Sequence, residues 1–325
     1  KDKTKDKYYE KFIIYLVSYV INEAEETFEN ASKLFEKNNI KLFCSSHNTL
    51  ISNSLRQFFN KKNIKTLMFL HGGTVGHFKK GFFWPDLSHT NLSNKKISFI
   101  QTFSEDQLKG IKKNDELSYL NKNIKYISFK PETFTNSKFL KKTPYSIGYI
   151  TQSNGNILTN LNQGNNDPFN LYKSRNKFLK EIINNQYNFK LYVSLTENNE
   201  NYFCDENLLN KAKNFNKIIL YKWNAIEILK KVNTVILEQP STTLIESLFF
   251  NIPKIIVINN PLWDFENSQK KMLGKRIIFA RNYDDINEFL FTNNNKNPKN
   301  NVFLKKYYLS KKNQSIDYFL KRIFS

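Results

Sequence analysis

Val235-Ile-Leu-Glu-Gln-Pro-Ser-Thr-Thr-Leu-Ile-Glu-Ser-Leu-Phe-Phe-Asn-Ile-Pro-Lys-Ile-Ile-Val257 reads as strand, hydroxyl-rich turn, helix and second strand. The first apolar run stops before Pro240, and a helix is expected to begin at Ser241. Hydroxyl and backbone N–H groups would then meet at the positive end of a helix dipole, which suits an anion such as phosphate. A Ser or Thr before a helix with an acid a few residues later is also an ordinary capping box, so both interpretations stay open at this point.

The same alternation of short apolar runs and helical segments extends along the whole chain. We expect strands at 41–44, 66–70, 97–102, 124–129, 145–150, 190–195 and 218–221, and helices at 23–37, 50–60, 171–184, 206–214 and 224–231. Strands that alternate with helices predict an α/β protein with parallel, doubly wound sheets. We expect two Rossmann-like domains, residues 1–142 and 143–300, with the ligand in the cleft between the carboxyl ends of the two sheets. Residues 301–325 are expected to form a C-terminal helix that packs back on the first domain.

The N-terminal apolar run and the cysteines bear on where the protein is found. The run Phe12–Ile21 is too short to span a bilayer, and we interpret it as a buried helix or strand. Cys44 and Cys204 are far apart in sequence and show neither a metal-ligand nor a redox-pair spacing. Such cysteine usage is typical of a reducing compartment, so we expect a cytoplasmic protein.

The charge of the chain predicts an anionic partner. The formal net charge is +21, with 50 Lys and Arg residues against 29 Asp and Glu residues. Nucleic acid, an acidic membrane face and an acidic or phosphorylated glycan all fit that charge. The lysines are spread along the whole chain and no nucleic-acid-binding motif occurs, so we expect no nucleic-acid partner. Peripheral contact with the inner face of an anionic membrane remains compatible with the charge. The lack of a Walker loop and of a Gly-x-Gly-x-x-Gly fingerprint argues against an ATPase and against a dinucleotide-dependent dehydrogenase.

Candidate residues of the first domain follow its first two strands. His71 lies just after a predicted strand and is the candidate general base, and Gly72 and Gly73 would let backbone N–H groups approach a ligand. A glycine turn with a locally satisfied histidine is the structural alternative. The acceptor-side candidates share basic or hydroxyl chemistry and are Ser46, His47, His77, Lys79 and Lys80. Asp86 is a second candidate base. Because no histidine pair or carboxylate is spaced along one helix face, we predict no metal site.

Candidate residues of the second domain surround the quoted stretch. Ser241, Thr242, Thr243 and Glu246 belong to the stretch itself. Thr151 follows the first strand of the domain and could contact phosphate. Lys222 and Trp223 end the strand one helix earlier and could border a nucleobase, although a tryptophan in the core is an equal alternative.

Taken together, these motifs resemble glycosyltransferases of the GT-B architecture, and more narrowly transferases of bacterial surface carbohydrate synthesis. The matching residues are Ser46-His47, His71-Gly72-Gly73-Thr74-Val75-Gly76 and Pro240-Ser241-Thr242-Thr243-Leu244-Ile245-Glu246, and the resemblance runs from about Lys41 to Leu290. Gln239 departs from it, since many relatives place an acid or a small residue before the proline.

The resemblance implies a donor site and an acceptor site. It implies that Ser241, Thr242 and Thr243 hold the phosphate of a nucleotide-sugar donor, that Glu246 binds a donor hydroxyl and that His71 deprotonates the acceptor. It implies no metal and no cofactor, because the nucleotide sugar is a substrate. It also implies an acceptor that is an anionic glycan or is linked to a lipid. A transferase that uses a CDP-polyol donor, a non-catalytic sugar or nucleotide binder and a basic nucleic-acid-binding protein remain as alternatives.

Overall fold

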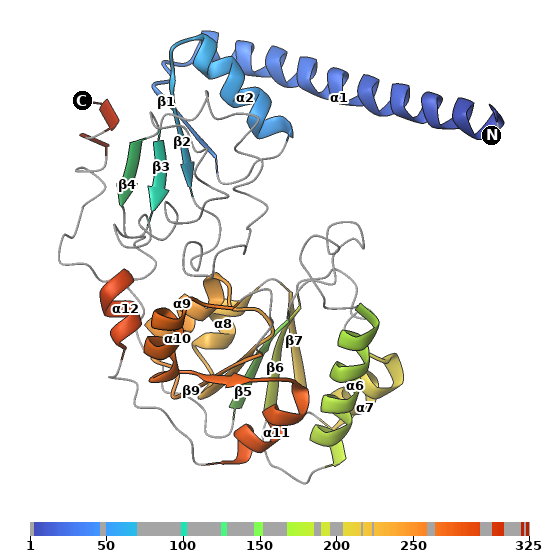
Figure 1. Cartoon of the computed structure of the whole chain (residues 1–325), viewed down its shortest axis with the longest axis vertical. Helices are drawn as coiled ribbons and strands as arrows, with labels where there is room; N and C mark the ends of the chain where they lie inside the picture. Colours follow the sequence, from blue (N-terminus) through green and yellow to red (C-terminus); the bar gives the residue numbers. More distant parts are fainter. Residues whose placement is uncertain are drawn as a thin grey trace.

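Figure 1 shows the computed structural model of the chain. The described residues are 3–45, 50–69, 99–102, 125–128, 146–151, 168–184, 190–195, 204–215, 217–222, 224–258, 264–292, 301–308, 320–321 and 323–324. Within them, the chain builds two separate sheets whose strands all pair in parallel. The prediction of an α/β protein with parallel sheets is confirmed.

The first sheet has four described strands in the order β1-β2-β3-β4. These are β1 (Leu42–Ser45), β2 (Lys65–Phe69), β3 (Phe99–Thr102) and β4 (Lys125–Ser128). Helix α2 (Leu50–Lys61) connects β1 to β2, and Asn63, two residues after its end, has a positive φ of 58° that turns the chain toward β2. The buried rings of Phe58 and Phe59 on α2 pack against Phe43 and Ile64, which holds α2 against the sheet.

The second sheet has six strands in the order β10-β9-β8-β5-β6-β7. Its strands are β5 (Ser146–Ile150), β6 (Lys190–Leu195), β7 (Ile218–Lys222), β8 (Thr234–Leu237), β9 (Lys254–Ile258) and β10 (Ile278–Ala280). Counted along this domain, the order is 3-2-1-4-5-6, which is the order of a Rossmann sheet. The chain therefore reverses direction across the sheet between β5 and β8.

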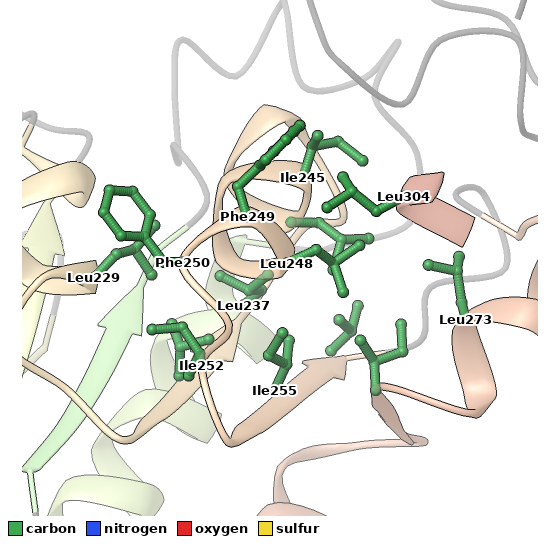
Figure 2. Packing of buried hydrophobic residues seen from close by; sticks show 14 of the residues in the cluster. Leu229, Leu237, Ile245, Leu248, Phe249, Phe250, Ile252, Ile255, Leu273 and Leu304 are labelled. Atoms are coloured by element: carbon green, nitrogen blue, oxygen red, sulfur yellow. The ribbon is translucent and has the colours of Figure 1, made fainter. Parts of the chain in front are cut away.

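Helices cover both faces of the second sheet. They are α6 (Pro168–Asn184), α7 (Glu206–Asn214), α8 (Ala225–Leu229), α9 (Thr242–Phe249), α10 (Asn267–Gly274), α11 (Tyr283–Phe291) and α12 (Val302–Tyr307). Val235 and Leu237 belong to the core beneath α8, α9, α10 and α12, while Ile236 between them belongs to the core beneath α6, α7 and α11. Figure 2 shows the first of these cores, in which Ile245 and Leu248 of α9 lie near Leu304 of α12. Because both faces are buried, the strands are mostly apolar rather than alternating.

Gly148 and Asn251 allow this packing locally. A Cβ atom at Gly148 on β5 would lie 2.7 Å from Cγ2 of Ile228, so the missing side chain lets α8 approach the sheet. Asn251 adopts a positive φ of 48° just after α9 and directs the chain into β9. The quoted stretch is therefore one compact β8-α9-β9 unit, as its pattern predicts.

The two ends of the chain pack differently from the rest of the domains. The prediction that Phe12–Ile21 is buried is wrong, because this run lies in the 35-residue helix α1 (Lys3–Lys37) and its described side chains are exposed. Within the predicted C-terminal segment, Phe303 and Leu304 of α12 pack on the second domain, against α9 and α10. Farther along, Ile323 packs on Leu67 of the first sheet and its carbonyl accepts a hydrogen bond from Lys65 Nζ at 2.5 Å.

Candidate functional site

The candidate site lies where the chain reverses direction across the second sheet. β5 and β8 are direct neighbours, paired from Ile147–Thr234 to Ile150–Leu237, and each leads to its next strand on a different side. Loops that leave such a switch point diverge, so they leave room for a ligand at the carboxyl ends of the strands. The residues after β8 are Glu238-Gln239-Pro240-Ser241, and α9 begins directly afterwards. The stretch Val235–Val257 therefore occupies this switch point.

The start of α9 does not have the geometry of a capping box. Ser241 is the N-cap residue, but its side chain makes no capping hydrogen bond. The third helical residue is Leu244, whereas a capping box needs an acid there, and Glu246 lies two residues farther on. By contrast, Asp205, Asn224 and Asn282 each cap their helices through a side-chain oxygen. The N-caps of α10 and α12 also make no side-chain capping hydrogen bond, so the structure excludes a capping box here and the anion-binding interpretation stays a prediction.

Glu246 lies in the second turn of α9 among apolar residues. Its neighbours in sequence, Ile245 and Ser247, are both fully buried. Burial raises the pKa of the Glu246 carboxyl to about 7. Within the described part of the chain the structure gives this carboxyl no ion pair. A carboxyl with such a pKa changes its charge near neutral pH and can accept or donate a hydrogen bond there.

A buried ion pair holds the strand end from which this site is built. Glu238, which follows β8 directly, accepts hydrogen bonds from Arg175 of α6 through Nε at 2.9 Å and Nη2 at 2.7 Å. The hydroxyls of Tyr149 and Tyr283 also donate to the same carboxylate oxygen, and they lie 2.9 Å from each other. Arg175 is 0% exposed and Glu238 is 3% exposed. Four elements of the domain thus converge on the residue that begins the turn to Ser241.

The electrostatics of this cluster favour one charge state. Burial alone would raise the pKa of Glu238, but the charge of Arg175 and the hydrogen bonds to it outweigh burial and keep that pKa below its usual range. Burial opposes the charge of Arg175 in the same way, yet the neighbouring carboxylate holds the pKa of the guanidinium well above its usual range. Burial and the nearby carboxylate raise the pKa values of Tyr149 and Tyr283, so both phenols stay neutral. The cluster is a neutralised unit in which Arg175, Glu238 and Tyr149 are buried and Tyr283 is partly buried.

Sequence reasoning missed this cluster. Glu238 lies inside the quoted stretch, but Arg175 is 63 residues away, on a different element. A charged residue directly after an apolar strand was a signal that something must neutralise it. No local pattern could identify the partner, because the pairing depends on how α6 packs on the sheet.

Thr151 and Lys222 are predicted to contact the donor, but the structure places them away from the start of α9 or pairs them with the sheet. The backbone N–H and the hydroxyl of Thr151 both donate to the carbonyl of Ser194, at 3.2 and 2.8 Å, so Thr151 ties β5 to β6. We therefore leave Thr151 out of the proposed site. Lys222 is exposed at the carboxyl end of β7, which is the edge strand. It lies three strands from β8, or about 14 Å at the usual strand spacing. Trp223 lies outside the described residues.

The predicted residues of the first domain follow two strands that the structure places side by side. β1 and β2 pair directly, with Ser45 opposite Met68, so the segments that carry Ser46-His47 and His71 leave the same edge of the sheet. Arg56 of α2 is buried at this edge and donates from Nη1 to the hydroxyl of Ser45 at 2.8 Å. The predicted residues themselves lie outside the described residues: Ser46, His47, His71, Gly72, Gly73, His77, Lys79, Lys80 and Asp86.

Comparisons with known proteins settle the fold. No protein-family model matches the sequence, and no curated protein matches it either. Among solved structures, a protein from Listeria monocytogenes assigned as a UDP-N-acetylglucosamine 2-epimerase aligns over 92% of this chain and 78% of its own, with a TM-score of 0.57 and 12% identity. MnaA of S. aureus, solved with UDP, covers 94% and 83% with a TM-score of 0.55 and 11% identity. UGT71G1 of Medicago truncatula, complexed with UDP-glucose, covers 93% and 79% with a TM-score of 0.53 and 10% identity.

The fold is GT-B. Two Rossmann-like domains with a cleft between them are the architecture that these alignments share with the chain, so the predicted fold class is confirmed. Identities of 10–12% carry the fold and no more. In the part of the chain that the structure describes, no group of three or more potential ligands is placed to hold a metal ion, and no helix is long and apolar enough to cross a membrane.

Proposed function

We propose that this GT-B protein is a glycosyltransferase that moves a sugar from a nucleotide-sugar donor to a glycan acceptor without a metal ion. The observation that carries the proposal is the position of Ser241, Thr242 and Thr243. They begin a helix at the switch point of a Rossmann sheet, the place where such sheets bind nucleotides. UDP and UDP-glucose occur in two of the GT-B structures that align with this chain, which supports a nucleotide-linked donor.

The proposed donor site uses the start of α9 as its phosphate-binding element. The first backbone N–H groups of a helix have no partner within the helix, and its dipole favours negative charge. The hydroxyls at 241–243 add donors that can rotate toward phosphate oxygens. Glu246 lies one turn farther along the same helix, where its carboxyl can bind a sugar or ribose hydroxyl. Its partial burial makes that hydrogen bond stronger than it would be in water.

In the proposed reaction, an acceptor hydroxyl attacks the anomeric carbon of the donor sugar. His71 takes the proton of that hydroxyl, the new glycosidic bond forms, and the bond between the anomeric carbon and the phosphate oxygen breaks. The nucleotide leaves with the bonding electrons, and its developing negative charge faces the start of α9. The helix dipole and hydroxyls thus supply the charge stabilisation that a metal ion supplies in other transferases. The basic composition of the chain suits an anionic glycan or lipid-linked acceptor at the inner face of a membrane.

A binding experiment tests the donor site directly. We expect thermal shift and calorimetry with UDP, GDP, CMP, CDP and their sugar conjugates to identify one base that stabilises the protein. Thr243→Val removes one hydroxyl at nearly constant volume and should weaken that binding roughly tenfold. Thr234→Val, at the opposite end of β8, is the matched control and should bind as the native protein does. Equal affinity of both variants would refute the proposed phosphate site.

Activity assays separate the catalytic proposals. His71→Ala should abolish transfer while donor binding persists, and unchanged turnover would exclude His71 as the base. Stabilisation by CDP-polyols alone would favour the polyol phosphotransferase alternative. Because the aligned protein from Listeria monocytogenes is assigned as a UDP-N-acetylglucosamine 2-epimerase, the donor should also be followed without acceptor. Conversion of the sugar under those conditions would replace transfer with epimerisation at the same site.

A further inference from the structure

Helix α1 carries an apolar surface that nothing in the described structure covers. Its second half packs on α2 through Phe28, Ala31 and Phe35, whereas its first half extends beyond α2 (Figure 1). Seven apolar or aromatic side chains in that first half are between 43% and 67% exposed: Phe12, Ile13, Ile14, Tyr15, Val17, Tyr19 and Ile21. Contiguous exposed apolar surface of this kind marks an interaction site.

The exposed run continues the face that α2 covers farther along. Ile13, Val17 and Ile21 precede Ala24, Phe28 and Ala31 at steps of three and four residues, so all six lie on one side of α1. A partner helix could therefore lie along this face in the first half of α1 much as α2 lies along it in the second half. The apolar run has ten residues, or about 15 Å of helix.

The charges on either side of this run are opposite in sign. Before it, residues 1–11 contain five lysines and three acidic residues, and the last of these lysines is Lys11. After it, residues 22–32 contain four glutamates, Glu23, Glu25, Glu26 and Glu29, and no basic residue. In an antiparallel pair of α1 helices centred near residue 16, the lysine-rich part of each helix lies beside the glutamate-rich part of the other. A parallel pair would place the glutamates side by side, which is unfavourable.

We propose that this face of α1 is a dimerisation surface on which a second copy of the chain packs its own α1 in antiparallel orientation. The charge arrangement distinguishes this partner from a membrane. Four glutamates directly after the apolar run would face anionic headgroups, and a run of about 15 Å is half the thickness of the hydrocarbon core. The inference is independent of the proposed enzymatic function, since α1 belongs to neither candidate binding edge.

Sedimentation velocity of the full chain over a range of concentrations tests the proposal. The native protein should dimerise, and Val17→Glu should abolish the dimer. Phe215→Glu is the matched control, because Phe215 is 58% exposed at the end of α7, and this variant should dimerise like the native chain. Circular dichroism and nucleotide-induced thermal shift verify that each variant is folded.

Charge reversal tests the orientation. Lys7→Glu/Lys11→Glu and Glu25→Lys/Glu26→Lys should each weaken dimerisation roughly tenfold or more, because like charges then face each other. The variant with all four changes has the native net charge and restores opposite charges in an antiparallel pair only, so it should dimerise again. Three results would each overturn the proposal. They are a monomeric native chain, a Val17→Glu variant that still dimerises, and a quadruple variant that dimerises as weakly as the two double variants. Binding to anionic vesicles by a monomeric native chain, lost in Val17→Glu, would assign the surface to a membrane instead.

Discussion

Replacing Glu246 with glutamine should make the ligand-free protein more stable and the donor complex weaker. The reason is the environment of the carboxyl on α9, where burial raises its pKa from 4.5 to about 7. A group whose pKa is higher in the folded than in the unfolded state favours folding while it is protonated and loses that contribution as the pH rises through the folded pKa. Glutamine has nearly the same shape and stays neutral at every pH.

The magnitude follows from the two pKa values. Ionisation of Glu246 in the folded protein costs the difference between about 7 and 4.5, which corresponds to about 3 kcal/mol at pH 8. Below pH 4 the carboxyl is protonated in both states, so native protein and Glu246→Gln should be equally stable. The stabilisation by the substitution should therefore appear between pH 4.5 and 7 and remain constant above that range.

Urea unfolding at a series of pH values measures this difference. Glu288→Gln on α11 is the matched control, because Glu288 is exposed and its substitution should change stability little. In parallel, calorimetry with the stabilising nucleotide sugar should show weaker binding by Glu246→Gln. A stability difference that does not change between pH 4 and pH 8 would refute the assignment of a partly buried carboxyl without a counter-charge. Unchanged donor affinity would refute its role in binding.

Three further substitutions test the scaffold of the second domain. Arg175→Met leaves Glu238 buried without its cation and should lower the free energy of unfolding by about 3–5 kcal/mol at pH 7. The lowered pKa of Glu238 stabilises the fold only above the pKa of the unfolded state, so this loss should shrink as the pH falls below 4. A loss that stays constant with pH would contradict the charge-based explanation. Gly148→Ala places a Cβ 2.7 Å from Ile228 Cγ2 and should cost about 1–3 kcal/mol in a urea titration, whereas a neutral effect would show that α8 moves freely. Lys254→Met removes a buried ammonium that donates to the carbonyls of residues 289, 290 and 292 at the end of α11, and it should lower the free energy of unfolding by about 2 kcal/mol. Amide hydrogen exchange should rise in α11 first. A uniform rise across the domain would argue against a local cap.

The second domain could be predicted from sequence because its local signals agree with its packing. Strand 190–195 and helix 206–214 have the predicted boundaries, since each is a clean run of one periodicity. Helix α10 (Asn267–Gly274) received no prediction, because it is mostly polar and buries only Leu273 fully, so it has little periodic signal. Strand β10 has three residues, which is too short for any pattern to emerge.

The N-terminal error has a different cause. Apolar content normally predicts burial within the same chain. Applied to the run Phe12–Ile21, this rule gave a wrong prediction, because the described side chains of the run are exposed. Sequence composition reports that a segment needs an apolar partner, but not whether the partner belongs to the same molecule. The proposed dimer would satisfy the same physical requirement from outside the chain.

Glu238 and Glu246 show how the structure separates scaffold from site within one short stretch. Both are carboxylates of the β8-α9 unit, and burial, nearly complete at Glu238 and partial at Glu246, acts on the pKa of each in the same direction. Glu238 receives a guanidinium and two phenol hydroxyls, and its pKa falls below the usual range; its needs are met inside the protein. Glu246 receives no cation from the described residues, and its pKa rises to about 7. The protein neutralises Glu238 with a complete set of partners but leaves Glu246, eight residues later, without a counter-charge from the described residues. The position of Glu246 therefore retains a cost in stability. The sequence motif marks Glu246, and not Glu238, as a binding residue, and the missing counter-charge at Glu246 agrees with its proposed contact with a donor hydroxyl.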